Sequence, residues 1–235
     1  MRRICAVIIS VTILATIILL PSINDISEAP IIDIGAGTPT EVGQHVERQY
    51  DWTYGGQHYS LTLFLSMDDY YNAINIDRST TTLTSYANYL TPNDQAVLAL
   101  ADSISSLDGD PALMMLSFVR SLDYRTDMDG YGVEEYPAYP IETLVNGYGD
   151  CEDLAALYVS VMHALGRDAA LLAMLDTPMG GHMAAGIAGP YDGAHIEHDG
   201  ITYYYAETTT HLDIGRVPAS LGWGSTKVYV LGAAS

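Results

Sequence analysis

The sequence contains very little cysteine. Only two of its 235 residues are cysteines. Cys5 lies in a hydrophobic N-terminal stretch, so Cys151 is alone in the rest of the chain and no disulfide can form there. A lone cysteine is either a small buried hydrophobe or a reactive thiol. Because Cys151 is flanked by Asp150, Glu152 and Asp153, we favour the reactive thiol.

Basic residues are also scarce. Nine Lys and Arg residues stand against 29 Asp and Glu, the formal net charge is −20, and Lys227 is the only lysine. Such a surface repels phosphate backbones and anionic lipid, which argues against nucleic acid or an anionic membrane surface as a partner. We interpret the acidic excess as a solubility device, and a basic substrate stays possible.

The N-terminus has the pattern of an export signal. Arg2 and Arg3 precede residues 4–20, which carry no charge and are at the short end for spanning a bilayer. We favour an uncleaved signal anchor over a cleaved signal peptide, because Pro30 would follow the nearest cleavage site at residues 27–29. The expected location is the cell membrane with the domain outside, or secretion after cleavage.

The predicted organisation has three parts. Residues 1–22 form the signal anchor or signal peptide, residues 23–44 a linker, and residues 45–235 a single folded domain. A hydrophobic content of 49% suits a folded globule. Within the domain we expect a hairpin and helical part (45–135) and a catalytic core (136–235).

The order of patterns indicates an α+β domain. Residues 46–65 read as a hairpin around Gly55 and Gly56, and helical patterns follow. Strand patterns then occupy residues 168–175, 182–188, 201–207 and 227–231. Consecutive strands of this kind are expected to pair antiparallel, with the helix that carries Cys151 packed across the sheet.

Cys151 is predicted to open that helix. Apolar residues recur at spacings of three and four from Leu154 onward, Asp150 suits the N-cap, and Gly166 suits the C-terminal stop. The free N–H groups and dipole of a helix N-terminus favour a thiolate, but the three neighbouring acids oppose it. A nearby imidazolium is therefore needed.

Two downstream residues complete a catalytic pattern. His182 opens a run of small apolar residues, and Glu207 ends a strong β pattern. A cysteine at a helix terminus, a histidine on one strand and a carboxylate on the next are typical of a Cys–His–carboxylate site.

Five motifs carry a resemblance to a known family. They are Tyr-Pro-x-Glu-Thr-Leu at 139–144, Gly-Asp-Cys-Glu-Asp at 149–153, Leu-Gly-Arg-Asp-Ala at 165–169, Gly-His-Met-Ala-Ala-Gly at 181–186, and Tyr-Tyr-Ala-Glu-Thr-Thr at 204–209. Together they resemble the transglutaminase-like superfamily, which has a papain-like fold, and in particular its microbial branch. The resemblance implies Cys151 as nucleophile, His182 as general base and acid, and Glu207 as the residue that orients the imidazole.

This resemblance predicts thiol acyl transfer on a peptide or carboxamide substrate. The Cys151 N–H is expected to donate to the oxyanion, with Asn146 or Tyr148 as candidates for the second donor. No cofactor and no metal are expected. Hydrolysis, deamidation and cross-linking stay open, with hydrolysis preferred, as do the substrate and the oligomeric state.

Three alternatives remain beside this interpretation. The first is a catalytically inactive binding or structural module on the same fold. The second is a metal-dependent hydrolase that uses His195 and His198, although an exposed loop explains these histidines better. The third is a calcium site at Asp127 and Asp129, but the EF-hand spacing fails and we expect a solvated loop over residues 121–140.

Overall fold

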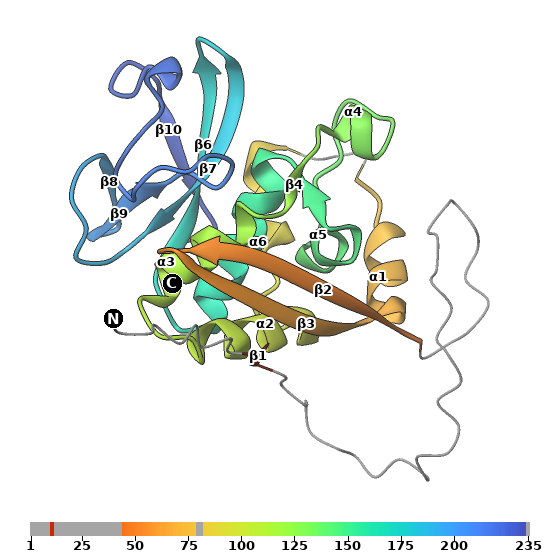
Figure 1. Cartoon of the computed structure of the whole chain (residues 1–235). Coiled ribbons are helices and arrows are strands. Elements are labelled where there is room, and N and C mark those ends of the chain that lie inside the picture. The colour runs from red at the N-terminus through yellow and green to blue at the C-terminus, as the bar shows by residue number, and fades with distance from the viewer. Residues whose placement is uncertain (1–9, 12–43, 79–81, 234–235) are drawn as a thin grey trace, which may run out of the picture.

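The computed structural model describes residues 10–11, 44–78 and 82–233 (Figure 1). The proposed anchor (1–22) and linker (23–44) lie outside these ranges apart from residues 10, 11 and 44, so both stay predictions. Within the described ranges, no helix has the length and apolar content that a bilayer span needs.

The first large element is the predicted β-hairpin. Strands β2 (His45–Tyr54) and β3 (Gln57–Ser66) pair antiparallel along their whole length. Gly55 and Gly56 form the turn with φ of 57° and 77°, the left-handed conformation that a tight hairpin turn needs. The two-residue strand β1 (Ser10–Val11) pairs in parallel with β3.

Helices occupy most of the middle of the chain. They are α1 (Met67–Ile74), the 3-10 helix η1 (Leu83–Tyr89), α2 (Gln95–Ser105), α3 (Pro111–Val119), α4 (Asp127–Gly130), α5 (Pro140–Asn146) and α6 (Cys151–Ala164). Local sequence explains their starts: the Ser66 hydroxyl accepts from the Asp69 N–H at 3.2 Å, and the Asp110 carboxylate accepts from the Ala112 N–H at 3.1 Å. Helix α6 ends at Ala164, and Gly166 follows its C-cap Leu165 with φ of 68°, the conformation of a C-terminal stop glycine.

A five-stranded antiparallel sheet follows α6. Its strands are β6 (Ala169–Thr177), β7 (Gly180–Ile187), β8 (His195–His198), β9 (Ile201–Ala206) and β10 (Val228–Leu231). Their order is β10-β6-β7-β9-β8, and every neighbouring pair is antiparallel. The 3-10 helix η2 (Ala219–Leu221) lies in the connection to β10.

Two predictions of loops were wrong. Residues 195–198, expected as an exposed loop, form β8 at the edge of the sheet, because their backbone pairs with β9 while the side chains stay largely polar. Residues 121–140 are also not one solvated loop: they hold β4 (Asp123–Tyr124), which pairs in parallel with β5 (Tyr148–Gly149), and the short α4.

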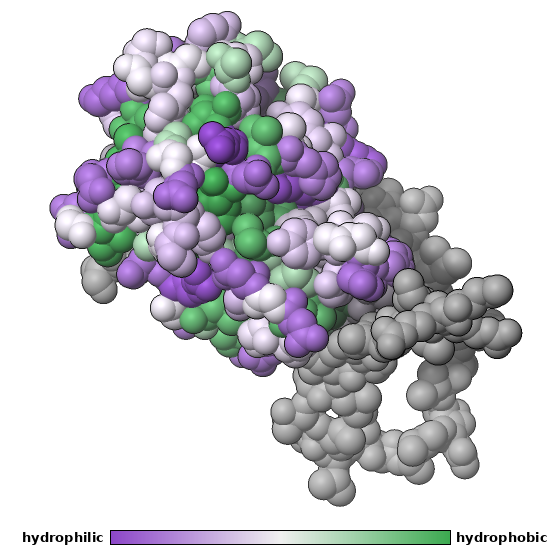
Figure 2. Space-filling model, turned by 60° about the vertical axis from the view of Figure 1, so that its left-hand side comes forward, coloured by the Kyte–Doolittle hydropathy of each residue, from purple (hydrophilic) through white to green (hydrophobic). Residues whose placement is uncertain are grey.

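The layers confirm an α+β domain with the Cys151 helix packed on an antiparallel sheet. Helix α6 packs on β6 and β7, and α2, α3 and α5 pack around it (Figure 1). Its Leu157, Tyr158 and Val159 are fully buried in the main core. A second, smaller core that includes Leu172 and Tyr205 is a separate cluster. On the face drawn in Figure 2, apolar side chains emerge in patches between hydrophilic ones.

Candidate functional site

The start of α6 holds Cys151 in a tight corner. Gly149 must be small there, since a Cβ on it would lie 2.6 Å from the Cβ of Asp153. The Asp150 N–H donates to the Asp153 carboxylate at 3.4 Å, which is the return half of a capping box. The chain thus enters the helix with Cys151 as its first residue, as predicted.

His182 and Glu207 form a direct pair. His182 lies near the start of β7, and Glu207 directly follows β9. The His182 Nε2 lies 3.1 Å from a Glu207 carboxylate oxygen, and only 1% of the Glu207 side chain is exposed. The prediction of neighbouring strands is confirmed, since β7 pairs with β9, but Glu207 lies one residue beyond the end of β9.

Glu207 is held by further donors. The Tyr205 hydroxyl donates to the oxygen that faces His182 at 2.5 Å, and Thr209 donates to the other oxygen from its N–H at 3.0 Å and its hydroxyl at 2.7 Å. Burial raises the pKa of Glu207, but the hydrogen bonds and charge of His182, with these donors, outweigh it and lower the pKa to about 2. Glu207 is therefore held in place as a carboxylate against His182 Nε2.

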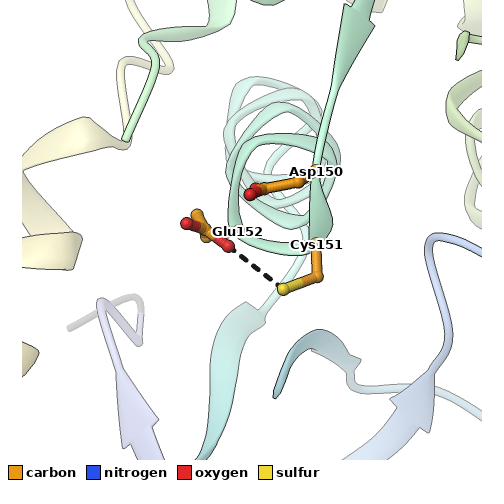
Figure 3. A group of neighbouring side chains, drawn as sticks. All are labelled: Asp150, Cys151 and Glu152. Atoms are coloured by element: carbon orange, nitrogen blue, oxygen red, sulfur yellow. Dashed lines mark hydrogen bonds between the residues drawn. The ribbon is translucent and has the colours of Figure 1, made fainter. Parts of the chain in front are cut away.

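The Cys151 thiol donates a hydrogen bond to the carboxylate of Glu152. Its sulfur lies 3.0 Å from a Glu152 carboxylate oxygen, and Figure 3 shows that carboxylate facing the sulfur. Burial raises the pKa of Cys151 well above its ordinary value, and the charges of Glu152 and Asp150 raise it further, while the Met183 N–H opposes them. Burial and the neighbouring carboxylates therefore favour the protonated form of the Cys151 thiol.

Several carboxylates lie close together at the N-terminus of α6. Oxygens of Asp127, Asp150 and Asp153 lie within 4.8 Å of one another, and so do those of Asp127, Glu135 and Glu152. Burial, followed by the charge of Glu152, raises the pKa of Asp150 to about 9. Asp127, which was expected in a solvated loop, is only 4% exposed. One oxygen each of Asp127 and Asp150 is buried and has no hydrogen-bond partner.

This oxygen-rich set is the part of the described chain best suited to hold a cation. Hard divalent ions such as Ca²⁺ prefer carboxylate oxygens, so Asp127, Asp150 and Asp153 could serve as ligands. The predicted alternative pair, His195 and His198, lies elsewhere on β8, where His195 contacts the Gly193 carbonyl at 2.8 Å.

One cleft contains Cys151, His182 and several of the carboxylates. It measures about 440 Å³ and is lined by Cys151, His182 and Met183 together with acidic and apolar side chains. A small concave site with a thiol, an oriented imidazole and nearby backbone N–H groups is suited to acyl transfer.

The two candidate oxyanion donors are engaged elsewhere. The Asn146 amide donates to the Tyr131 hydroxyl at 3.3 Å, and the Tyr148 hydroxyl donates to the Gly130 carbonyl at 3.2 Å. Neither residue is among those that line the cleft. Their role as oxyanion donors stays a prediction.

Sequence reasoning missed three residues of the site. Tyr205 precedes Glu207 by two positions, and the period of a strand was the signal that puts both side chains on one side. Glu152 was noted only as an opposing charge, although it is the partner of the thiol. Arg120, at the end of α3, donates to the Glu207 carbonyl at 2.9 and 2.7 Å, and no sequence signal links it to the site.

Comparisons with known proteins find similar solved structures but no matching sequence family. No family model matches the chain, and no curated protein matches its sequence. Similar solved structures include Legionella pneumophila LapG, with 21% identity, a TM-score of 0.39, and coverage of 56% of this chain and 79% of that chain. Calcium-bound LapG of Legionella pneumophila has 19% identity and a TM-score of 0.38, and the match covers 62% of this chain and 81% of that chain. A TGase has 10% identity and a TM-score of 0.36, and the match covers 75% of this chain and 47% of that chain.

Proposed function

We propose that this chain is a transglutaminase-like thiol acyl-transfer enzyme that acts on peptide or carboxamide bonds. The observation that carries the proposal is the His182–Glu207 pair, 3.1 Å apart, because its His182 lines the same cleft as Cys151, the one cysteine of the described chain. The five sequence motifs support the same family. The expected partner is a protein or peptide outside the cell membrane.

The first step is activation of the thiol. Glu207 binds Nε2 of His182, which leaves Nδ1 as the nitrogen that can accept a proton. The Cys151 side chain turns from Glu152 to this nitrogen and transfers its proton, and the imidazolium that forms is stabilised by Glu207.

Acyl transfer then takes two steps. The thiolate attacks the carbonyl carbon, the oxyanion accepts a hydrogen bond from the Cys151 N–H, and His182 returns the proton to the departing amine as the carbon–nitrogen bond breaks. The thioester is then attacked by water, which gives a carboxylic acid, or by an amine, which gives a new amide. His182 takes the proton of the attacking group and returns it to the sulfur. We favour water, so that the enzyme is a hydrolase.

A second candidate is an inactive binding module with this fold. The raised pKa of Cys151 and its hydrogen bond to Glu152 favour this alternative, because both disfavour the thiolate that the acyl-transfer mechanism needs.

Peptide turnover tests the proposal. Wild type should release amine from a fluorogenic peptide library, and Cys151→Ala and His182→Ala should each lose at least about 10³-fold in kcat/KM. Glu207→Gln should lose at least tenfold or so, because Gln still bonds to the imidazole but lacks the charge. Glu197→Gln, which removes a carboxylate on β8, is the matched control. Turnover that survives in Cys151→Ala, or wild type that turns over no member of the library, would contradict the enzyme assignment.

A further inference from the structure

The Glu207 carboxylate makes four polar contacts, about as many as the lone-pair sites that its two oxygens offer. Thr209 donates to Oε1 from both its N–H and its hydroxyl. Oε2 faces His182 Nε2 at 3.1 Å and accepts from the Tyr205 hydroxyl at 2.5 Å. Because the Glu207 side chain is only 1% exposed, solvent has little access to replace a donor that is lost.

The Tyr205 hydroxyl also lies next to the histidine ring. Its oxygen is 3.4 Å from His182 Nε2. A hydroxyl has one proton to donate, and the shorter contact assigns that proton to the Glu207 carboxylate. Nε2 therefore faces two acceptors, the carboxylate oxygen and the phenol oxygen, and both favour the tautomer with the proton on Nε2. Nδ1 is then the nitrogen that can accept a proton.

Packing fixes the position of the Tyr205 hydroxyl. The side chain is fully buried in the second core, where the Trp223 ring packs edge-on against it with 5.4 Å between the ring centroids. The Tyr205 N–H donates to the Ala194 carbonyl at 3.0 Å, and the Tyr205 carbonyl accepts from the Gly215 N–H at 2.7 Å. Burial, followed by the charge of Glu207, raises the pKa of Tyr205, so the hydroxyl stays a donor.

We propose that Tyr205 is a positioning residue for His182. Its hydroxyl fills the acceptor site of Glu207 Oε2 that the imidazole leaves open, and this keeps the oxygen turned toward Nε2 and the ring in one orientation. Without the hydroxyl, the carboxylate can rotate about its terminal bond, and the ring also populates a flipped orientation with the proton on Nδ1. This inference rests on the proposed function, in which Nδ1 takes the proton of Cys151, but the ring orientation is measurable without turnover.

NMR of the histidine ring nitrogens tests the positioning directly. In the full-length chain with isotope-labelled histidine at pH 8, His182 should show a single tautomer with the proton on Nε2, assigned by its loss in His182→Ala. Tyr205→Phe keeps the buried ring and removes the hydroxyl alone, so the Nδ1–H tautomer should rise to at least about a fifth of the population. Tyr203→Phe is the matched control, because Tyr203 is an equally buried tyrosine on β9 whose hydroxyl has no hydrogen-bond partner within the described chain.

Turnover of the peptide library gives a second measurement, which a loss of stability alone would not reproduce. Tyr205→Phe should lower kcat roughly tenfold and leave KM nearly unchanged, and Tyr203→Phe should keep the wild-type kcat. Made in a Glu207→Gln background, Tyr205→Phe should cost less than about twofold, because the hydroxyl acts through the carboxylate. An active enzyme in which Tyr205→Phe leaves kcat unchanged would contradict the role.

The outcomes separate this inference from the proposed function. A single Nε2–H tautomer in Tyr205→Phe overturns the positioning role, whatever the turnover, and so do equal changes in Tyr205→Phe and Tyr203→Phe. If the tautomer shifts only in Tyr205→Phe and wild type turns over no peptide, the positioning role holds and the enzyme assignment fails. If Tyr205→Phe does not fold, wild type decides: the Tyr205 hydroxyl proton should show a nuclear Overhauser contact to the proton on Nε2, and a missing contact overturns the inference.

Discussion

At the scale of single residues, the reactivity of Cys151 depends on its neighbours more than on its helix. The helix N-terminus favours a thiolate, but burial and the charges of Glu152 and Asp150 raise the pKa of the thiol well above its ordinary value. The bond from the thiol to Glu152 therefore holds the proton on sulfur.

Removal of the Glu152 charge should make the thiol more reactive. In Glu152→Gln the pKa of Cys151 falls, so alkylation by iodoacetamide at pH 8 should be roughly three- to tenfold faster than in wild type, as followed by mass spectrometry. Glu134→Gln is the control, since Glu134 lines the same cleft but the thiol bonds to Glu152. Equal rates in wild type and both variants would contradict the role of Glu152.

The charge of Glu207 should stabilise the fold above acidic pH. Its folded-state pKa of about 2 lies below the ordinary 4.5, so the stabilisation is complete above about pH 4.5 and is lost as the pH falls toward 2. Between pH 5 and pH 3 the free energy of unfolding of wild type should fall by about 2 kcal/mol more than that of Glu207→Gln. Urea unfolding at the two pH values measures this, and parallel curves would show that Glu207 is not stabilised as an anion.

The three candidate catalytic residues could be proposed from sequence because each lies at the boundary of a regular element. Glycines and capping acids mark the start of a helix, and alternation of apolar and polar residues marks where a strand starts and ends. Glu152 as thiol partner could not be proposed in this way, because side-chain direction at the first turn of a helix depends on what the helix packs against.

At the scale of elements, Asp150 at the beginning of α6 caps the helix but is buried next to the negative charge of Glu152. Asp150 is the N-cap, but burial and Glu152 raise its pKa to about 9. The folded state therefore favours protonated Asp150, whereas the unfolded chain is ionised above about pH 4. The folded state is penalised increasingly as the pH rises from about 4 to about 9.

Asp150→Asn should relieve this penalty and keep the cap. Asn is as good an N-cap as Asp, so at pH 8 in chelator the variant should gain about 2 kcal/mol, or ~4–8 °C in Tm. Thermal unfolding at pH 8 and pH 4.5 measures the effect, which should nearly vanish at the lower pH. Asp102→Asn, the control, removes an exposed charge on α2 and should leave the Tm unchanged at both pH values. A lower Tm for Asp150→Asn than for wild type at pH 8 would show that the ionised Asp150 does not destabilise the fold.

Elements with strong periodic patterns were predictable, and short polar ones were not. The hairpin, α3, α6 and the strands β6, β7, β9 and β10 follow from alternation, apolar spacing and capping residues. The strands β4, β5 and β8 have two to four residues and few apolar side chains. Backbone pairing with a partner that is distant in sequence, or at the edge of a sheet, forms such strands without a local signal.

At the scale of the whole molecule, Arg120 links the helical half to the sheet. Its guanidinium donates to the carbonyls of Glu207 and Leu212, which fixes the chain as it leaves β9. In the proposed mechanism Glu207 orients His182, so we expect Arg120 to act as a positioning residue through the backbone of Glu207.

Arg120→Lys should lower kcat roughly tenfold and leave KM nearly unchanged, because lysine cannot make the same set of bonds and Glu207 shifts. The pH dependence of kcat should also change, which a loss of stability alone would not cause. Arg167→Lys, which weakens the 2.9 Å pair with Asp110, is the control for loss of a structural arginine. If both variants lose activity in proportion to Tm, Arg120 has no positioning role.

The sequence by itself determined the α+β order of elements, the helix that Cys151 opens, and the three residues of the candidate site, because these depend on local spacing and capping. Tertiary structure alone decided that Glu152 holds the thiol proton, that Asp127 is buried beside Asp150, and that Arg120 supports Glu207. Some of these features depend on contacts between segments far apart in the chain, and the others depend on burial, which raises the free-energy cost of a charge. Local spacing in the sequence encodes neither long-range contacts nor burial.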